Sequence, residues 1–195
     1  GVTKEKRYVV QKGTAATLDF AAVTAQAGRI LKIFQQQFPG LADSCITAGK
    51  KAWEWALLNP ALEYDQNSIN KKFAPAITTG GYGDRNFSDE WLWAAAELFL
   101  TTREDRFYKV VEDHLKDNVN LPNWGSVGMM AYYSFLHFSD QLPATYSATL
   151  TLMKNRIISI ADSYIEKTNV NAFHTAMGQS VRDFNWGSNS NAANQ

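Results

Sequence analysis

The stretch TGGYGDRNFSDEWLWAAAELFLTT, from Thr79 to Thr102, decides the fold class of this chain. Its second part, Trp91 to Leu100, is apolar except for Glu97, and such a run predicts a buried helix. Ser88 is a residue type preferred at helix N-termini, so we expect it to cap this helix, which then runs to about Thr102. The glycines in the first part predict a tightly turning loop before the helix.

Helical periodicity continues on both sides of this stretch. The apolar residues of the first two expected helices recur at steps of three and four, as in helices that pack on a core: Phe20, Val23, Ala27, Ile30 and Phe34, then Leu41, Cys45, Ala48, Ala52 and Trp55. We expect helices from Thr14 to a stop at Pro39-Gly40, from Leu41 to about Leu57, Glu104 to Leu115, Gly125 to Phe138 and Pro143 to Thr168, with another beginning at Ser188.

Residues 60–87 show no sustained period, and a loop of that length in a compact domain is commonly functional. Only Arg7 to Val10 has any strand-like alternation. The sequence therefore predicts an all-α protein of stacked helical hairpins, whose longer loops gather on one face and build a cleft.

Charge and composition exclude several classes of protein. The formal net charge of the 195 residues is zero and no basic face stands out, which argues against a nucleic-acid binder. No apolar run reaches the roughly 20 residues that a membrane span needs. Cys45 is the single cysteine, so no internal disulfide is possible, and we expect a buried thiol. Both ends look cut, and we expect a piece of a longer protein.

Four segments together resemble family 9 glycoside hydrolases, which are cellulases of the (α/α)6 toroid type. In chain order they are KGTAATLDFAAVTAQAGRI (Lys12 to Ile30), AWEWALLNP (Ala52 to Pro60), the Thr79 to Thr102 stretch, and FNWGSNSNAANQ (Phe184 to Gln195). Each is weak alone, but they span nearly the whole chain in the family's order. The resemblance implies that residues 1–195 are a single partial domain, the middle segment of the catalytic domain, containing about half of a toroid of six inner and six outer helices.

The resemblance also implies a function. Family 9 enzymes hydrolyse β-1,4-glucan with inversion, which requires one carboxylate to activate water and another to protonate the leaving oxygen. The family's Asp-Ala-Gly-Asp motif would lie before this chain and its acidic Glu after it, so no catalytic carboxylate is assigned. The family also implies a secreted, periplasmic or cell-surface location, and this chain shows no targeting signal of its own.

Asp89 and Glu90 match an acidic pair that holds a structural calcium ion in some family members, together with loop carbonyl oxygens. Calcium prefers such hard oxygen ligands. The loop departs from those members, because Arg85 and Asn86 stand at the carbonyl-donor positions and Arg85 adds positive charge. The alternative is that acidic residues in a first helical turn simply favour the helix dipole, without a metal.

Trp124 and Trp186 each precede a glycine where a loop meets an expected helix. An indole ring matches the apolar face of a pyranose, so both are candidate sugar-stacking platforms, in agreement with positions where the family places cleft aromatics. The glycine-rich loop would place Tyr82 or Asp84 at the cleft floor. Packing as a hydrophobic staple at the helix start is the alternative for each tryptophan.

Three functions remain open from sequence. The first is a segment of a secreted endo-β-1,4-glucanase that binds β-1,4-glucan or cello-oligosaccharide and is completed by the remainder of its domain or by a second copy of the chain. The alternative is a non-catalytic carbohydrate-binding helical module. The third is a structural α-hairpin domain with Trp124 and Trp186 buried.

Overall fold

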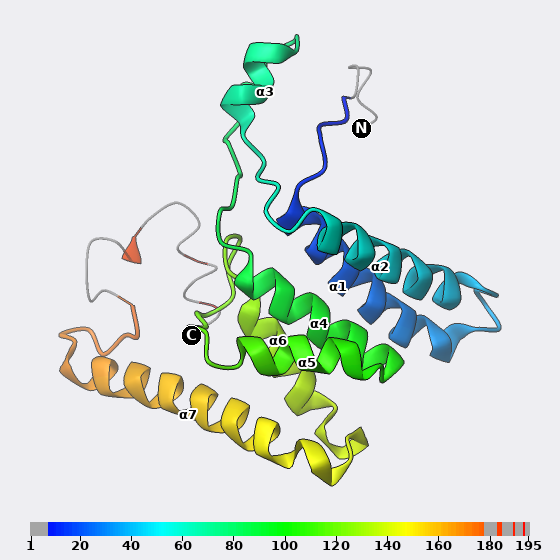
Figure 1. Ribbon diagram of the computed structural model, residues 1–195. Helices are drawn as coiled ribbons and strands as arrows, with labels where there is room; N and C mark the ends of the chain where they lie inside the picture. Colours follow the sequence, from blue (N-terminus) through cyan, green and yellow to red (C-terminus); the bar gives the residue numbers. More distant parts are fainter. Residues whose placement is uncertain (1–7, 178–182, 185–188, 190–192, 194–195) are drawn as a thin grey trace.

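Figure 1 shows the computed structural model, which describes residues 8–177, 183, 184, 189 and 193. Six helices of ten or more residues form this part of the chain, and it contains no β-strand. They follow one another as three pairs: α1 (Thr14–Leu31) with α2 (Leu41–Leu58), α4 (Ser88–Thr102) with α5 (Asp105–His114), and α6 (Gly128–His137) with α7 (Ser147–Val170). The prediction of an all-α chain of helical hairpins is confirmed.

Shorter elements connect these pairs. The seven-residue helix α3 (Gln66–Lys72) projects from the rest of the molecule on two extended segments (Figure 1). Short 3-10 turns occupy Lys32–Phe34, Ser139–Gln141 and Ala144–Tyr146. Within the described part of the chain, no helix combines the length and apolar character that crossing a bilayer requires.

The central helix is α4, and its bounds agree with the sequence prediction. Every residue from Leu92 to Leu100 is buried, Glu97 included, because α4 packs against α1, α2, α5 and α6. Ser88 does not cap this helix, contrary to expectation. It is the first helical residue, and its backbone N–H donates to Oδ1 of Asn86 at 3.2 Å. Trp93 and Trp53 are buried whereas Trp91 and Trp55, two positions away on the same helices, are half-buried.

Glu97 joins three helices at the core. Arg29 of α1 donates through Nη2 to Glu97 Oε2 at 2.5 Å, and Ser134 of α6 donates to Oε1. The Arg29 Nη1 atom also donates to Thr101 Oγ1 at 2.7 Å. Because an unpaired buried charge is strongly destabilising, this network fixes α1 and α6 to α4.

The α1–α2 pair packs through small residues. A Cβ atom added to Gly28 would lie 2.5 Å from Ile46 Cγ1 and 3.1 Å from the Ala42 carbonyl oxygen, so only glycine allows this approach. The buried residues of α1 are small apart from Leu18: Thr14, Leu18, Ala21, Ala22, Ala25 and Gly28. Those of α2 are Ala42, Gly49, Trp53 and Ala56.

The two apolar stripes predicted to pack on the core are therefore misassigned. On α1, Phe20, Val23 and Ile30 are about half exposed, as is Phe34 beyond it, because the opposite face of small residues packs on α2 and α4. On α2, the predicted stripe is half-buried, Cys45 included, and Leu41 is exposed. We call the exposed residues Phe20, Val23, Ile30 and Phe34 the outer face of α1.

Several helix assignments also differ from expectation. The α1 helix ends at Leu31, because a 3-10 turn and the hydrogen bonds that Gln37 and Phe38 donate to the Phe34 carbonyl turn the chain before Pro39. Helix α3 lies within the segment expected to be a loop. Helix α6 begins at Gly128 rather than Gly125.

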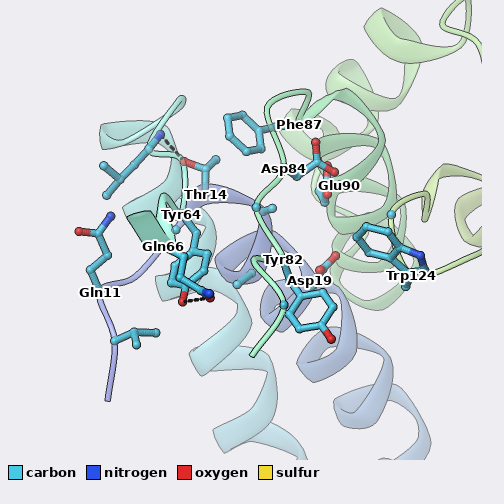
Figure 2. Close-up of a pocket in the computed structure, with 18 of the residues that line it drawn as sticks. Gln11, Thr14, Asp19, Tyr64, Gln66, Tyr82, Asp84, Phe87, Glu90 and Trp124 are labelled. Carbon is cyan, nitrogen blue, oxygen red and sulfur yellow. Dashed lines mark hydrogen bonds between the residues drawn. The ribbon is translucent and has the colours of Figure 1, made fainter. Parts of the chain in front are cut away.

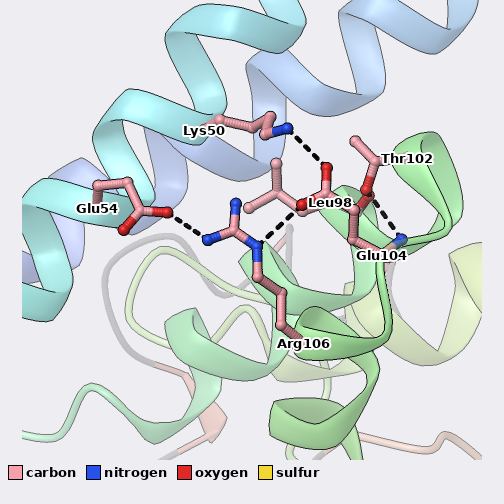
Figure 3. A network of polar contacts seen from close by, with 6 residues as sticks. All are labelled: Lys50, Glu54, Leu98, Thr102, Glu104 and Arg106. Carbon is pink, nitrogen blue, oxygen red and sulfur yellow. Dashed lines mark hydrogen bonds and ion pairs between the residues drawn. The ribbon is translucent and has the colours of Figure 1, made fainter.

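Figure 3 shows a network of charged side chains that connects α2 to α5. Lys50 Nζ and Arg106 Nε lie 2.7 Å and 2.9 Å from the two carboxylate oxygens of Glu104, and Arg106 also pairs with Glu54. These side chains are each at least a third exposed, so each pair is worth about 0–1 kcal/mol.

Candidate functional site

A recess of about 360 Å³ opens at the end of the molecule where α1 and α4 begin (Figure 2). Its walls come from segments far apart in the sequence, within 10–19, 62–66, 79–90 and 124–125. The structure brings together three of the predicted substrate-binding residues, Tyr82, Asp84 and Trp124, all of which line the recess. Trp186 lies outside the described residues.

Thr14 holds the N-terminal wall of the recess against the segment that follows α2. Its buried hydroxyl donates to the Asn59 carbonyl oxygen at 2.6 Å and accepts from the Leu62 N–H at 2.8 Å. The Thr14 N–H in turn donates to the Leu62 carbonyl oxygen at 2.9 Å. Both functions of the hydroxyl are thereby used within the chain, and the start of α1 is fixed beside the 62–66 wall.

Side-chain amides fix the extended segment that returns from α3. Asn70 donates to the Ile77 carbonyl oxygen at 2.9 Å and accepts from the Ile77 N–H at 2.7 Å. Gln66 donates to the Thr79 carbonyl oxygen at 2.7 Å. Asp65 caps α3 by accepting a hydrogen bond from the Ser68 N–H. We call α3 and the two extended segments that flank it the arm, and these bonds hold the glycine-rich loop at the recess in a defined position.

The glycine-rich loop passes close to the 62–66 wall. A Cβ atom added to Gly83 would lie 2.5 Å from the Tyr64 carbonyl oxygen, a distance that no other residue type can accommodate there. Arg85 Nε donates to Glu63 Oε1 at 2.8 Å on the outer side of the same contact. The absence of a side chain at Gly83 therefore lets the loop pass against the 62–66 wall beside Tyr82.

Tyr82 and Trp124 form an aromatic rim on the recess. Their ring centroids lie 6.1 Å apart with an interplanar angle of 81°, and the side chains are 65% and 75% exposed. A tight turn presents Trp124, because Asn123 and Ser126 exchange two backbone hydrogen bonds and Asn123 Oδ1 accepts from the Gly125 N–H. This exposure contradicts the hypothesis that Trp124 is buried in a purely structural domain.

The acidic residues predicted to bind metal occupy two different environments. Asp89 Oδ2 accepts from the Val127 N–H at 2.8 Å, so this carboxylate ties the start of α4 to the start of α6. Glu90 is 5% exposed, and its Oε2 atom is buried without a hydrogen-bond partner. Both lie in the first turn of α4, where negative charge favours the helix dipole.

Two carboxyl groups beside the recess have raised pKa values. Burial, followed by the negative charge of Asp89, raises the pKa of Glu90 to about 9. Burial, followed by the charges of Asp89 and Asp84, raises the pKa of Asp19 to about 6. At neutral pH Glu90 is therefore protonated and Asp19 is mostly ionised.

The orphaned oxygen atoms test whether calcium fits this site. Asp19 Oδ1, like Glu90 Oε2, is buried without a hydrogen-bond donor, and such oxygens are calcium ligands by type. Within the described ranges, however, no three His, Cys, Asp or Glu side chains gather into a metal-binding group. The described side chains alone therefore do not make up a calcium site.

Sequence reasoning did not place Asp19, Tyr64 or Gln66 in a site. Asp19 lies one turn after Ala15 and Ala16, which also line the recess, so an acidic side chain on an alanine-rich helix face is the signal that could have identified it. Tyr64 lies in the extended segment before α3 and Gln66 is the first residue of that helix, and no apolar periodicity marks either position.

The chain was compared with known proteins. The glycosyl hydrolase family 9 profile matches residues 2–195. A xyloglucan-specific endo-β-1,4-glucanase of Bacteroides ovatus is 34% identical over 184 residues, which cover 94% of this chain and 31% of that protein. Endoglucanase C of Cellulomonas fimi is 30% identical over 199 residues, covering 97% of this chain and 16% of that protein.

Solved structures give the same result. A family 9 structure from Bacteroides ovatus superposes with a TM-score of 0.88 at 34% identity, covering 95% of this chain and 34% of that chain. A thermostable endoglucanase from Alicyclobacillus acidocaldarius shares the fold with a TM-score of 0.76 at 24% identity. The chain thus spans about a third of the length of these relatives' structures and supplies part of an (α/α)6 toroid. With the family profile matching nearly all of its residues, the chain belongs to glycosyl hydrolase family 9.

Proposed function

We propose that this chain forms one wall of the glucan-binding cleft of an inverting endo-β-1,4-glucanase. The observation that carries the proposal is the Tyr82–Trp124 rim, which exposes two aromatic rings beside a recess lined by both apolar and polar side chains. Flat rings of this kind stack on the apolar faces of pyranoses, while hydroxyl groups require polar partners. The carbohydrate-binding module without catalytic function is disfavoured, because the family to which the chain belongs is one of hydrolases.

The chain's part in the reaction is to bind and orient the glucan. Inversion needs a general base and a general acid about 6.5–9.5 Å apart. We propose that both come from outside these 195 residues, as the family motifs imply. Trp124 then positions a glucose unit by stacking, and Asp84 stays at the recess wall, where its Oδ1 atom accepts from the Asn86 N–H at 2.9 Å.

A structural calcium ion is a second proposal. The two orphaned carboxylate oxygens, Glu90 Oε2 and Asp19 Oδ1, support it, since both are buried without a hydrogen-bond partner. Glu90 would supply a ligand oxygen after losing its proton, while Asp89 contributes charge beside its bond to Val127. Bound calcium would neutralise the cluster and hold the start of α4.

We propose further that the outer face of α1 is covered by the remainder of the same domain, or by a second copy of the chain. The names of its relatives indicate glucans as substrates, xyloglucan in one case, and a β-1,4-glucan or cello-oligosaccharide is proposed for this chain. Because such polymers lie outside cells, a secreted, periplasmic or cell-surface location is proposed as well.

Tryptophan fluorescence with cellohexaose, and maltohexaose as control, tests the binding proposal. We expect saturable quenching by the β-1,4-linked ligand alone. In calorimetry, Trp124→Ala should weaken cellohexaose binding about tenfold, because a stacked ring is lost. Phe173→Ala removes another exposed ring, which lies outside the recess, and should leave affinity unchanged. Equal responses to the two sugars, or no response to either, would contradict the proposal.

A further inference from the structure

The backbone beneath Trp124, rather than burial of its ring, determines where this side chain stands. Three quarters of the side chain is exposed, and the aromatic contact that its ring makes with Tyr82 is edge-on, with the centroids 6.1 Å apart (Figure 2). The backbone under the ring is tightly folded, because Asn123 and Ser126 exchange two hydrogen bonds of 3.0 Å and 3.2 Å. Residues 123–126, which we call the Trp124 turn, therefore form one compact unit that carries the ring.

The Trp124 turn is anchored on its C-terminal side by Asp89. Its last residue, Ser126, is 9% exposed, and the next N–H group along the chain, that of Val127, donates to Asp89 Oδ2 at 2.8 Å. Gly128 follows, and a Cβ atom added there would lie 3.0 Å from Asp89 Cβ and 3.6 Å from Asp89 Cα. The two residues after the turn therefore lie directly against Asp89.

Asp89 is a fixed point because it belongs to the central helix. It lies in the first turn of α4, which packs against α1, α2, α5 and α6. Its carboxylate also lies at the start of α6, where the first backbone N–H groups of a helix have no partner within the helix. A carboxylate that accepts from a backbone N–H makes one of the stronger hydrogen bonds in proteins, and the dipoles of both helices favour its negative charge.

The other ring of the rim is connected to the same turn of α4. Tyr82 belongs to the loop that leads into Ser88, the first residue of α4, and the Ser88 N–H donates to Asn86 within that loop. Asp89 connects the first turn of α4 to Val127, which is 38 positions further along the chain. The arrangement of the two rings, with an interplanar angle of 81°, is therefore set at the first turn of α4.

We propose that Asp89 is the positioning residue of the aromatic rim, because its hydrogen bond to Val127 holds Trp124 beside Tyr82 before a glucan binds. Asp89 does not touch the sugar in this role. A ring that is held in place in advance loses less freedom on binding, so the bond should raise the affinity for the glucan. The inference rests on the proposed function for its ligand, whereas the position of the ring can be measured without any sugar.

Nuclear magnetic resonance tests the position of Trp124 in the free chain. The indole N–H signal of Trp124 is identified by its loss in Trp124→Phe, and its heteronuclear NOE reports motion of the ring on the picosecond to nanosecond timescale. We expect a lower NOE in Asp89→Ala, which removes the acceptor. The NOE should be unchanged in Asp89→Asn, whose amide oxygen can still accept from Val127. The indole signals of Trp53 and Trp93, which are buried, should keep their NOE in both variants.

Calorimetry with cellohexaose tests the consequence for binding. Asp89→Ala should bind about fivefold more weakly, as expected when one side chain must be ordered on binding, and Asp89→Asn should bind like the unsubstituted chain. In the Trp124→Ala background, Asp89→Ala should cause no further loss, because the ring that it positions is gone. Asp105→Ala is the matched control, since it removes an acidic residue from the first turn of α5 and should leave both the NOE and the affinity unchanged.

Equal effects of Asp89→Ala and Asp89→Asn would overturn the inference, since the charge and not the hydrogen bond would then matter. Additive losses of affinity from Asp89→Ala and Trp124→Ala would overturn it as well, because Asp89 would then act on the glucan by another route. If Asp89→Ala does not fold, Asp89→Ser replaces it, because the shorter side chain withdraws the acceptor and stays polar. An unsubstituted chain that binds no cellohexaose would contradict the proposed function, while the NOE comparison would still decide whether Asp89 positions the ring.

Discussion

Glu90 keeps a proton in the folded protein at pH values where an ordinary glutamate has lost it. Burial and the charge of Asp89 raise its pKa from 4.5 to about 9, so between these values the folded state binds a proton that the unfolded state has released. Stability must then fall as pH rises through this window, since the proton stabilises only the folded state. Asp19 adds a similar effect that ends near pH 6, where its raised pKa lies.

The pH dependence of unfolding tests this assignment. Between pH 6.5 and 9, with calcium chelated, the melting temperature of the protein should fall, whereas that of Glu90→Gln should stay nearly level because no proton is released. Added calcium should raise the melting temperature most at the upper end of this range, and by less in Glu90→Gln. Parallel melting curves for the two proteins would show that Glu90 titrates normally. The same response to calcium in both would remove Glu90 from the proposed cation site.

At the scale of elements, two charged networks join the helices with different strength. Removing one partner of a buried ion pair leaves an uncompensated charge and costs about 3–5 kcal/mol, so Glu97→Gln should strongly destabilise the protein in urea denaturation. Glu104→Gln acts on the exposed network between α2 and α5 and should lower the free energy of unfolding by about 1 kcal/mol or less. This loss should be smaller still in high salt. Similar losses from both substitutions would mean that the Arg29–Glu97 pair does not hold α1 to α4.

The sequence predicted elements well where one local signal was sufficient. Helix α4 could be predicted from its contiguous apolar run, and Pro and Gly residues divided the other helices correctly in order. Helix α3, QNSINKK, carries no apolar stripe and depends on the Asp65 cap and on Asn70, whose bonds to Ile77 close the arm. The predicted buried face of α1 was wrong for a related reason. The larger apolar residues of this helix mark one face, but its small residues pack on α2 and α4.

The candidate site was predictable only in part for the same physical reason. Glycines in the loops and the family resemblance indicated Tyr82, Asp84 and Trp124 as site residues, and the fold brings these three into one recess. That Asp19 joins them depends on how α1 packs beside α4, a long-range contact with no local signature. Likewise, nothing in the sequence around Asp89 shows that its carboxylate bonds to the start of α6.

The whole molecule exposes the outer face of α1, an apolar stripe with the spacing of a packed helix. The chain spans only about a third of its relatives' structures, and we propose that further helices of the toroid pack on this face. Without them, we expect the chain to self-associate with rising concentration in sedimentation velocity. The double variant Phe20→Ser/Ile30→Ser should reduce this association, because exposed apolar area drives it.

Val170→Ser provides the matched control, because Val170 is also exposed but lies at the end of α7, away from this face. It should associate like the unsubstituted chain. A chain that stays monomeric at all concentrations, or variants that all behave alike, would contradict a docking role for the outer face of α1.

The chain alone is also expected to lack measurable hydrolysis of β-1,4-glucan, because neither proposed catalytic carboxylate lies within it. Release of reducing ends from carboxymethylcellulose measures this directly. If activity were found and were lost in Asp19→Asn or Asp84→Asn, these recess carboxylates would be catalytic and the proposed division of labour would be wrong.

The pairing of Arg29 with Glu97 has a further consequence during synthesis. The two residues are 68 positions apart, so at about 5–20 residues per second a ribosome makes Glu97 roughly 3 to 14 seconds after Arg29. Once Leu58 has been added and until Glu97 follows, the residues of α1 and α2 are present without the acidic partner of Arg29 or the helix that covers their small-residue face. The nascent chain therefore offers a chaperone an apolar hairpin with an unpaired guanidinium, which disappears once α4 leaves the exit tunnel.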